Sequence, residues 1–230
     1  MQTQKDLPSF QKQVSRYPES FLTRFLTLAE QEVVRQAKPN AIFEGGYPGA
    51  ELKRAYTTDD PQIVTLAVSV VDALGEIGHR HVMGSLLALG IERDTFGDIL
   101  VMDDFIVFVT KDIAAFIESH LQVSNRPTSI RRITEPITYQ STLQEKTVIS
   151  TSMRVDNLVA SVYNMSRSQA QALIKRGYVR LNGVEMESQT KECKPNDILS
   201  VRTKGKCKIL EISGKSKKDK YIVVVGKYID

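Results

Sequence analysis

Cationic side chains concentrate in the last eighty residues of this chain. Residues 151–230 contain sixteen Lys and Arg against eight Asp and Glu, whereas the whole chain carries a net charge of only +4, so residues 1–150 sum to −4. Guanidinium and ammonium groups both bind phosphate oxygens, Arg through paired hydrogen bonds and Lys as a mobile point charge. This division of charge predicts an RNA- or DNA-binding module attached to an acidic body.

Within this module ten side chains are candidates for RNA contact. Arg167 is predicted in the first turn of a helix, where free backbone N–H groups and the helix dipole also attract phosphate. Lys175 follows two turns later beside Arg176, so these cations can line one side of a helix pair. The full set is Arg154, Ser166, Arg167, Gln171, Lys175, Arg176, Arg180, Lys215, Lys217 and Lys218. We expect this surface to recognise the backbone and shape of RNA more than base edges.

Two parts of this set have an alternative explanation. Arg154 is explained equally well by a phosphate contact and by an ion pair with Asp156. Asp156 itself is expected to be structural, orienting a neighbouring cation or capping the backbone. The lysines of residues 215–220 are explained equally well as a solvated hairpin loop.

The module that must position these residues consists of two short helices followed by small strands. The first helix has an apolar stripe formed by Val155, Leu158, Val159 and Val162. The second begins with a capping box at Ser166 and ends at Gly177, which is typical of a helix C-terminus. Asn182-Gly183 predicts a type I′ turn. Residues 209–212 and 221–225 are predicted to form a closing β-hairpin.

The first 140 residues show two patterns. Residues 1–60 have apolar positions at helical spacing and predict a helical subdomain. Residues 61–140 predict the order β-α-β-β-α-β, the split ferredoxin-like arrangement that RNA-recognition domains also use. The predicted elements are strand 63–71, helix 79–89, strands 98–102 and 105–110, helix 111–121 and strand 129–134. Residues 136–152 are predicted to be a linker.

Two features of the middle region invite a functional reading. Phe105 and Phe108 lie where RNA-recognition domains carry stacking aromatics, but their opposite parity on one strand favours core packing. The loop around Gly45-Gly46-Tyr47-Pro48-Gly49 is expected to be a connector rather than an interaction surface.

Several classes of protein are disfavoured by the composition. The longest apolar stretch has about half of the roughly 20 residues that a membrane-spanning helix needs, and the N-terminus has no signal-peptide pattern. Cys193 and Cys207 are predicted to be reduced thiols of a cytoplasmic protein, because they form no Cys-x-x-Cys pair and the histidines are far away. We expect no metal and no other cofactor.

The C-terminal pattern resembles the S4 RNA-binding domain over about fifty residues. The residues that carry the resemblance are Arg154-Val155-Asp156, Ser166-Arg167, Ala170, Leu173-Ile174, Gly177, Val179, Asn182-Gly183 and Asp197-Ile198. The chain departs from the family at Asn196, where Gly is usual. Asn tolerates the left-handed conformation, so the turn is expected to survive.

The chain as a whole resembles the YlmH-type S4 proteins of Gram-positive bacteria. Its Gly-Gly-Tyr-Pro-Gly-Ala-Glu loop, Gly84-Ser85-Leu86 and Gly97-Asp98-Ile99 add to the S4 pattern. The resemblance implies an α+β protein with an N-terminal helical segment (1–60), a ferredoxin-like, RRM-like domain (61–140) and an S4 domain with a C-terminal hairpin (151–230). It also implies binding to the large ribosomal subunit, with a role in ribosome-associated quality control. We expect a cytoplasmic monomer that binds rRNA, with tRNA as a second candidate.

Three functions remain open at this point. A non-catalytic RNA-binding factor is the main prediction. The alternative is an RNA-modifying enzyme with an S4 accessory domain, of the pseudouridine synthase or methyltransferase kind, but residues 1–150 show no catalytic or methyl-donor motif. A protein-binding role of the acidic half is compatible with the main prediction.

Overall fold

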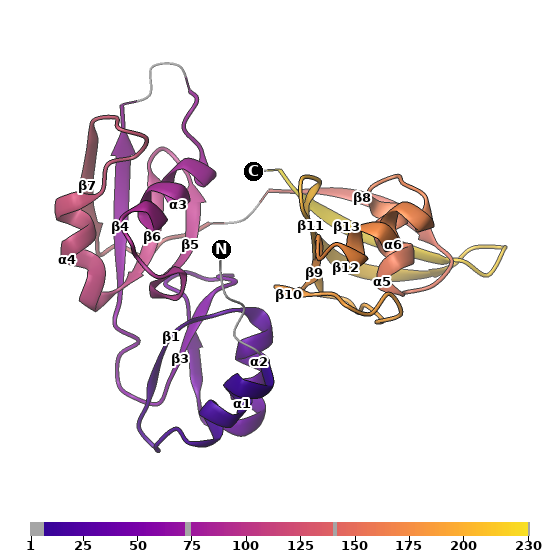
Figure 1. Ribbon diagram of the computed structural model, residues 1–230, viewed down its shortest axis with the longest axis horizontal. Coiled ribbons are helices and arrows are strands. Elements are labelled where there is room, and N and C mark those ends of the chain that lie inside the picture. Colours follow the sequence, from indigo (N-terminus) through magenta and orange to yellow (C-terminus); the bar gives the residue numbers. More distant parts are fainter. Residues whose placement is uncertain (1–6, 72–74, 140–141, 230) are drawn as a thin grey trace. The chain divides into compact units, whose positions relative to one another are not determined.

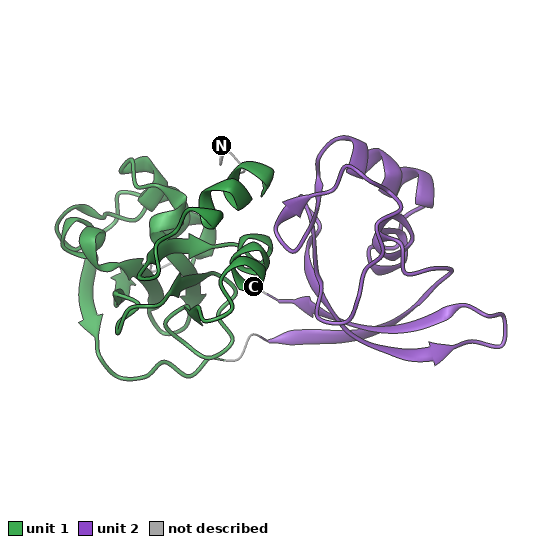
Figure 2. Ribbon diagram, turned by 90° about the horizontal axis from the view of Figure 1, so that it is seen from below, with its two compact units in different colours: residues 1–140 green, residues 141–230 purple. Residues whose placement is uncertain are grey.

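The computed structural model describes residues 7–71, 75–139 and 142–229. The chain divides into two compact units, residues 1–140 (unit 1) and residues 141–230 (unit 2) (Figure 2). Each unit combines helices with antiparallel sheets, so the α+β prediction is confirmed (Figure 1). Among the described residues, no helix is long and apolar enough to cross a membrane.

The N-terminal part of unit 1 is not the helical subdomain that the sequence predicts. Its elements are α1 (Leu7–Ser15), β1 (Leu22–Leu26), α2 (Leu28–Ala37), β2 (Ile42–Glu44) and β3 (Lys53–Tyr56), with the strands in the order β1-β3-β2. The apolar residues of β1 and α2 together fit the spacing of a single helix, so the pattern predicts a helix where the chain forms a strand and then a helix. The chain changes period at Thr27, whose side chain forms a capping box with Glu30 and so starts α2 there.

The second part of unit 1 has the predicted β-α-β-β-α-β order. Its elements are β4 (Ile63–Val70), α3 (His79–Ala88), a 3₁₀ turn (Arg93–Thr95), β5 (Phe96–Val101), β6 (Phe105–Thr110), α4 (Lys111–His120) and β7 (Thr128–Ile133). The strand order β5-β6-β4-β7 is that of a ferredoxin-like sheet. Val82, Leu86 and Ile117 pack from the two helices onto one face of this sheet. Phe116, on α4, is 44% exposed and stacks on His120.

Buried polar side chains join the two parts of unit 1. Arg54 on β3 is buried and donates hydrogen bonds to the backbone oxygens of Thr23 (2.6 Å) and Gln62 (2.8 Å). The second oxygen belongs to the residue that precedes β4. Residues 1–60 and 61–140 therefore belong to one compact unit.

Unit 2 is a six-stranded sheet with two helices. Its elements are β8 (Leu143–Ser150), α5 (Val155–Val162), α6 (Arg167–Lys175), β9 (Val179–Leu181), β10 (Val184–Glu185), β11 (Ile198–Val201), β12 (Gly205–Lys215) and β13 (Tyr221–Tyr228). The strand order is β10-β9-β11-β12-β13-β8. The prediction of a linker over 136–152 is wrong, because β8 pairs with β13 from Leu143 to Ser150. Its β-branched run Thr147–Ile149 favours a strand.

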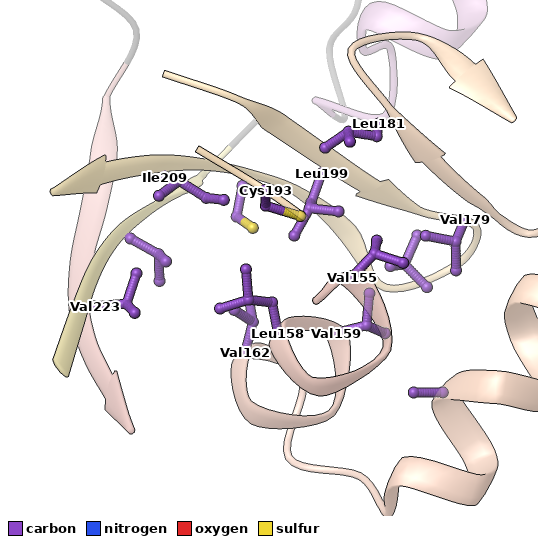
Figure 3. Packing of buried hydrophobic residues seen from close by; sticks show 14 of the residues in the cluster. Val155, Leu158, Val159, Val162, Val179, Leu181, Cys193, Leu199, Ile209 and Val223 are labelled. Atoms are coloured by element: carbon purple, nitrogen blue, oxygen red, sulfur yellow. The ribbon is translucent and has the colours of Figure 1, made fainter. Parts of the chain in front are cut away.

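The core of unit 2 lies between the helices and one face of the sheet (Figure 3). All four residues of the predicted α5 stripe are buried there, which confirms that prediction. Cys193 and Cys207 are free and buried in the same core. Burial raises the pKa of their thiols to about 12 and about 11, so both are protonated at neutral pH and inert.

Left-handed residues at the predicted turns set the path of the chain after α6. Gly177 has φ +71° and closes the helix, with its N–H donating to the Ile174 carbonyl. Asn182 and Gly183 both have positive φ, as a type I′ turn requires. Asn196 also adopts the left-handed conformation (φ 72°), so the turn survives the departure from the family pattern.

Candidate nucleic-acid interface

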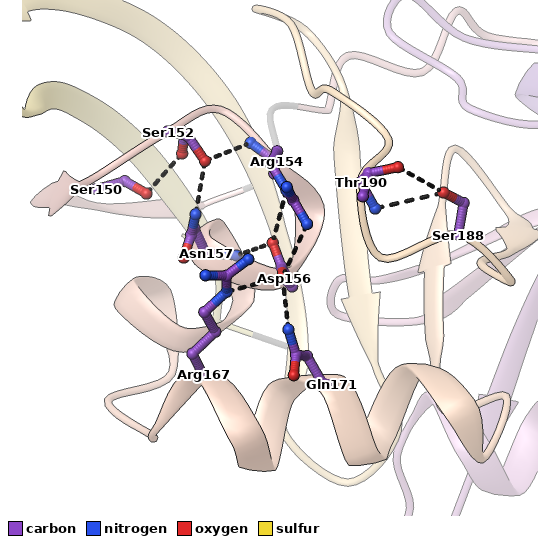
Figure 4. Close-up of polar contacts among 9 residues, drawn as sticks. All are labelled: Ser150, Ser152, Arg154, Asp156, Asn157, Arg167, Gln171, Ser188 and Thr190. Carbon is purple, nitrogen blue, oxygen red and sulfur yellow. Dashed lines mark hydrogen bonds and ion pairs between the residues drawn. The ribbon is translucent and has the colours of Figure 1, made fainter.

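A buried carboxylate organises the helix pair of unit 2. Asp156, in the first turn of α5, has no exposed surface. One of its oxygens accepts hydrogen bonds from Arg167 Nε (2.9 Å) and Gln171 Nε2 (3.0 Å), both on α6. The other accepts from the Asn157 backbone N–H (2.9 Å) and lies 3.4 Å from Arg154 Nε. Figure 4 shows the side chains of Arg154, Arg167 and Gln171 converging on this carboxylate.

This cluster carries a net positive charge. Burial alone would raise the pKa of Asp156, but the hydrogen bonds from Gln171 and Arg167 and the charges of the two arginines lower it below its ordinary value. Asp156 is therefore ionised at neutral pH. Arg154 and Arg167 keep 34% and 50% of their side-chain surface exposed, so one buried anion holds two cations that still face solvent.

The ion pair expected as one explanation of Arg154 is thus present, and Asp156 has the orienting role expected of it. The pair does not remove Arg154 from the candidates for RNA contact, because one carboxylate charge is shared between two guanidinium groups. The ion pair is therefore confirmed, and the phosphate contact of Arg154 stays a prediction.

Helix α6 carries the cations in one stripe. Arg167, Gln171 and Lys175 follow each other at intervals of four residues, which places them on one side of the helix over about 12 Å. Lys175 and Arg176 are exposed at its C-terminal end. Ala170 and Ile174 lie on the buried side. Arg176 follows Arg167 by about two and a half helical turns and therefore points to the opposite side of the helix. We call Arg154, Arg167, Gln171 and Lys175 the helical face.

Ser166 contributes to this face through the helix that it starts. Its hydroxyl accepts a hydrogen bond from the Gln169 N–H (3.2 Å), and Gln169 Oε1 accepts one from the Ser166 N–H (2.9 Å). The predicted capping box is confirmed. Ser166 is itself exposed at the N-terminus of α6, where the helix dipole favours anions.

The remaining predicted residues lie elsewhere in unit 2. Arg180 is flanked on β9 by Val179 and Leu181, which point into the core beneath the helices, so its own side chain is on the other face of the sheet. Lys215 pairs with Asp219 (2.8 Å) at the end of the β12–β13 hairpin. Lys217 and Lys218 are exposed in the turn that follows. The structure therefore does not bring Arg180 together with the helical face.

In unit 1 the second face of the ferredoxin-like sheet is covered by the chain itself. Phe105 packs into the core under the helices, and Phe108 is fully buried on the opposite face, which confirms that both are packing residues. The Tyr47 ring stacks on Phe108, with centroids 5.0 Å apart and planes at 20°. The loop that carries Tyr47 is thus more than the connector that the sequence suggests.

Sequence reasoning missed two groups of residues in these places. Ser152 and Asn157 fix the start of α5, since Asn157 Nδ2 donates to Ser152 Oγ (2.6 Å). In unit 1, Asp98 accepts from the Tyr47 hydroxyl (3.0 Å) and the Glu51 N–H (2.7 Å) and so anchors the Tyr47 loop. Gly97-Asp98 enters the prediction only as part of a family pattern, because no neighbouring residue indicates that Asp98 contacts a loop about fifty residues earlier.

Comparison with known proteins identifies the family. The chain is 32% identical over 220 residues to the "Ribosome-associated protein quality control protein P2" of Bacillus subtilis (strain 168), covering 88% of this chain and 85% of that protein. The chain belongs to the YlmH-type S4 proteins. The family model described as "Putative RNA-binding domain in YlmH" matches residues 57–135, and the S4 domain model matches residues 153–199. A solved structure, "Cell division protein ylmH from Streptococcus pneumoniae", is similar at 19% identity over 58% of this chain and 93% of that one, with a TM-score of 0.45.

This membership has a direct consequence for function. The two family models each cover just over half of one unit, and RNA binding is the property that they share. The YlmH-type chain is accordingly an RNA-binding protein, and its matched families are RNA-binding rather than catalytic.

Proposed function

We propose that this YlmH-type protein binds ribosomal RNA of the large subunit through the helical face of unit 2, without catalysing a reaction. The observation that carries the proposal is the pair of guanidinium groups held by Asp156, to which Lys175 adds a third cation further along α6. Cations that begin at a helix N-terminus and continue along one side of the helix suit the regularly spaced phosphates of folded RNA.

The ribosomal target and the pathway are supported by the relative. The B. subtilis protein is named for ribosome-associated protein quality control. We infer the same association for this chain, in the cytoplasm, as a monomer, with tRNA as a second candidate partner beside the rRNA.

The physical argument predicts a strong dependence on salt. Each neutralised phosphate contributes about −0.7 to −0.9 to the slope of log affinity against log salt concentration. The three cations of the helical face therefore give a slope of about −2.4. Between 50 and 200 mM salt the affinity should fall by about thirtyfold.

The test is co-sedimentation with purified ribosomal subunits at two salt concentrations. Wild type is compared with Arg167→Ala/Lys175→Ala, which removes two cations of the helical face. The matched control is Lys12→Ala/Arg16→Ala, which removes two exposed cations from unit 1.

We expect salt-sensitive binding to the large subunit that the first double variant loses and the control retains. Equal losses in both would show that net charge rather than the helical face drives binding. Absence of wild-type binding to either subunit would refute the ribosomal target.

A further inference from the structure

We propose that Asp156 is a positioning residue of the RNA-binding face: it contacts no RNA itself but fixes the directions in which Arg154 and Arg167 present their charges. This inference rests on the proposed function and deepens it. Asp156 is buried completely, so its charge acts on RNA only through the side chains that surround it.

The geometry shows what the carboxylate holds in place. Arg154 precedes α5 and Arg167 begins α6, so the two cations come from different segments of the chain. Arg167 is anchored by a hydrogen bond from its Nε (2.9 Å). Arg154 is held by an ion pair, with its Nε 3.4 Å from one carboxylate oxygen and a terminal amino group 3.5 Å from the other. Gln171, one turn further along α6, donates a hydrogen bond to the same carboxylate. A single side chain thus fixes the separation of the two guanidinium groups and the packing of one helix start on the other.

Anchoring of this kind lowers the cost of binding. Arg side chains free in solvent must be ordered when they meet phosphate, whereas pre-organised side chains lose less freedom. Anchoring through Nε also leaves the terminal amino groups of Arg167 at the exposed end of the side chain, where paired phosphate contacts form.

Asp156→Asn separates positioning from charge because the two effects have opposite signs. The substitution keeps the shape of the side chain and raises the net charge of the face by one. If RNA were attracted only by the summed charge, the variant would bind more tightly and its salt slope would steepen. If Asp156 positions the arginines, the variant binds more weakly, since an amide holds two guanidinium groups poorly and they repel each other.

The test measures affinity of the full-length protein for purified large ribosomal subunits. We expect Asp156→Asn to bind about tenfold more weakly than wild type, in line with the factor of ten that a loss of roughly 1.4 kcal/mol gives. Arg167→Lys is the second variant: it conserves charge on an exposed residue but removes the Nε donor that Asp156 accepts, so it too should bind more weakly.

The outcomes are distinct. Wild-type binding with equal or tighter binding of Asp156→Asn would overturn the positioning role alone. If Asp156→Asn does not fold, as thermal unfolding would reveal, wild-type affinity of Arg167→Lys would overturn it instead. Absence of wild-type binding would refute the proposed function and the positioning role together.

An independent observation concerns the middle region that the "Putative RNA-binding domain in YlmH" model matches. We infer that its sheet does not bind RNA through the face on which RNA-recognition domains stack bases. That face carries Ala67 of β4 and Phe108 of β6, both fully buried. Tyr47 stacks on Phe108 in the position that a base would take.

The Tyr47 loop that covers this face is fixed by hydrogen bonds and close packing within unit 1. Asp98 on β5 holds the loop through the Tyr47 hydroxyl and the N–H groups of Glu51 and Leu52. Gly46 approaches so closely that a Cβ there would lie 2.2 Å from the Phe108 ring, and its φ of +93° also favours glycine. Displacing the loop would expose Phe108 and leave the half-buried Asp98 without these partners.

The arginines of edge strand β7 are balanced by acidic neighbours. Arg131 and Arg132 pair with Asp104 (3.1 Å) and Glu118 (2.7 Å), and Arg126 just before the strand pairs with Glu76 (2.8 Å). Each of these arginines has its own acidic partner, unlike the two that share Asp156.

Tyr47→Ala tests the closed face in the full-length protein. If RNA normally displaces the loop, removing the Tyr47 ring should raise the affinity for large subunits by several-fold. If the face is closed, the melting temperature falls and the affinity stays within about twofold of wild type.

Ultraviolet cross-linking of the wild-type complex to RNA, mapped by mass spectrometry, gives a second measurement that does not depend on a variant. We expect cross-links in unit 2 and none at Phe108 or Tyr47. A cross-link at either ring, or a gain of affinity in Tyr47→Ala, would overturn the inference.

Discussion

Substituting Ser166 by Ala and by Asp separates the capping role of this residue from its place at the start of the helical face. Its hydroxyl is the acceptor for the Gln169 N–H. Ala removes that acceptor, which costs about 1 kcal/mol, with a range of about 0.5–2. For a unit of the size of residues 141–230, a loss of about 1 kcal/mol corresponds to a melting temperature lower by about 4–8 °C.

Asp at the same position should preserve stability but weaken binding. A carboxylate is as good an N-cap as a hydroxyl, and its charge is favourable at a helix N-terminus, so stability should stay near that of wild type. The same charge lies beside Arg167 and opposes phosphate. We expect the salt slope to shrink by about 0.7–0.9 and the affinity at 0.1 M salt to fall about five- to tenfold.

The assay combines calorimetric unfolding with binding to large ribosomal subunits for both variants. Ser119→Asp is the control, because it adds the same charge to an exposed serine on α4 of unit 1. If Ser166→Asp were as unstable as Ser166→Ala, the hydroxyl would not be acting as a cap. If Ser166→Asp bound subunits like wild type while remaining folded, the N-terminus of α6 would not face phosphate, and the reasoning about the helical face would fail.

Three further outcomes can be measured on the same protein. Gly84→Ala in α3 should stabilise unit 1 by about 0.5–1 kcal/mol in urea unfolding, because a Cβ there meets nothing within 4 Å; a loss of stability would contradict this. Leu158→Ala, at a fully buried position, should cost about 2–5 kcal/mol, whereas Ile149→Ala, at a 58% exposed one, should be much milder. The folded state lowers the pKa of Asp156, so the ionised carboxylate stabilises the fold fully above the unfolded-state pKa of about 3.9. This stabilisation is lost as the pH falls through the lower folded-state pKa. Acid unfolding at the same pH in Asp156→Asn as in wild type would exclude this contribution.

The parts of the fold that could be predicted from the sequence are those fixed by local signals. The capping box at Ser166, the helix end at Gly177 and the Asn182-Gly183 turn each depend on a few neighbouring residues. These signals set the length of α6 and the entry into β9, and they agree with the buried stripe of α5. Where local propensity and tertiary packing favour the same structure, the sequence is a sufficient guide.

The elements that were mispredicted depend on distant partners. Strand β1 has apolar residues that also fit a helical stripe, and only pairing with β3 distinguishes the two. Strand β8 follows a loop and is an edge strand, so its alternation is weak. Its pairing with β13 joins residues more than seventy positions apart. Such contacts cannot be derived from a short sequence window.

The candidate site shows the same limit. The Arg154–Asp156 pair is close in sequence and was considered, but the contact between Asp156 and Gln171 spans fifteen residues. The position of Arg180 was misjudged because strand parity has meaning only once the buried face is known, and Val179 and Leu181 show that face. Charge and helix position therefore identified the cations without showing which of them share a surface.

Pairing, together with the excess of cations over anions in the C-terminal part, distinguishes the two units. Arg131 and Arg132 in unit 1 each have their own carboxylate, so their positive charges are balanced locally. Arg154 and Arg167 in unit 2 share one buried carboxylate, which leaves an excess positive charge with its direction fixed. A phosphate that approaches an exposed, paired cation must compete with the carboxylate beside it, so little binding free energy is gained. A cation in excess over the neighbouring anions, already held in place, attracts the phosphate without that competition. This difference, together with the Tyr47 cover on the unit 1 sheet, explains why RNA binding should depend on the helical face even though arginines occur throughout the chain.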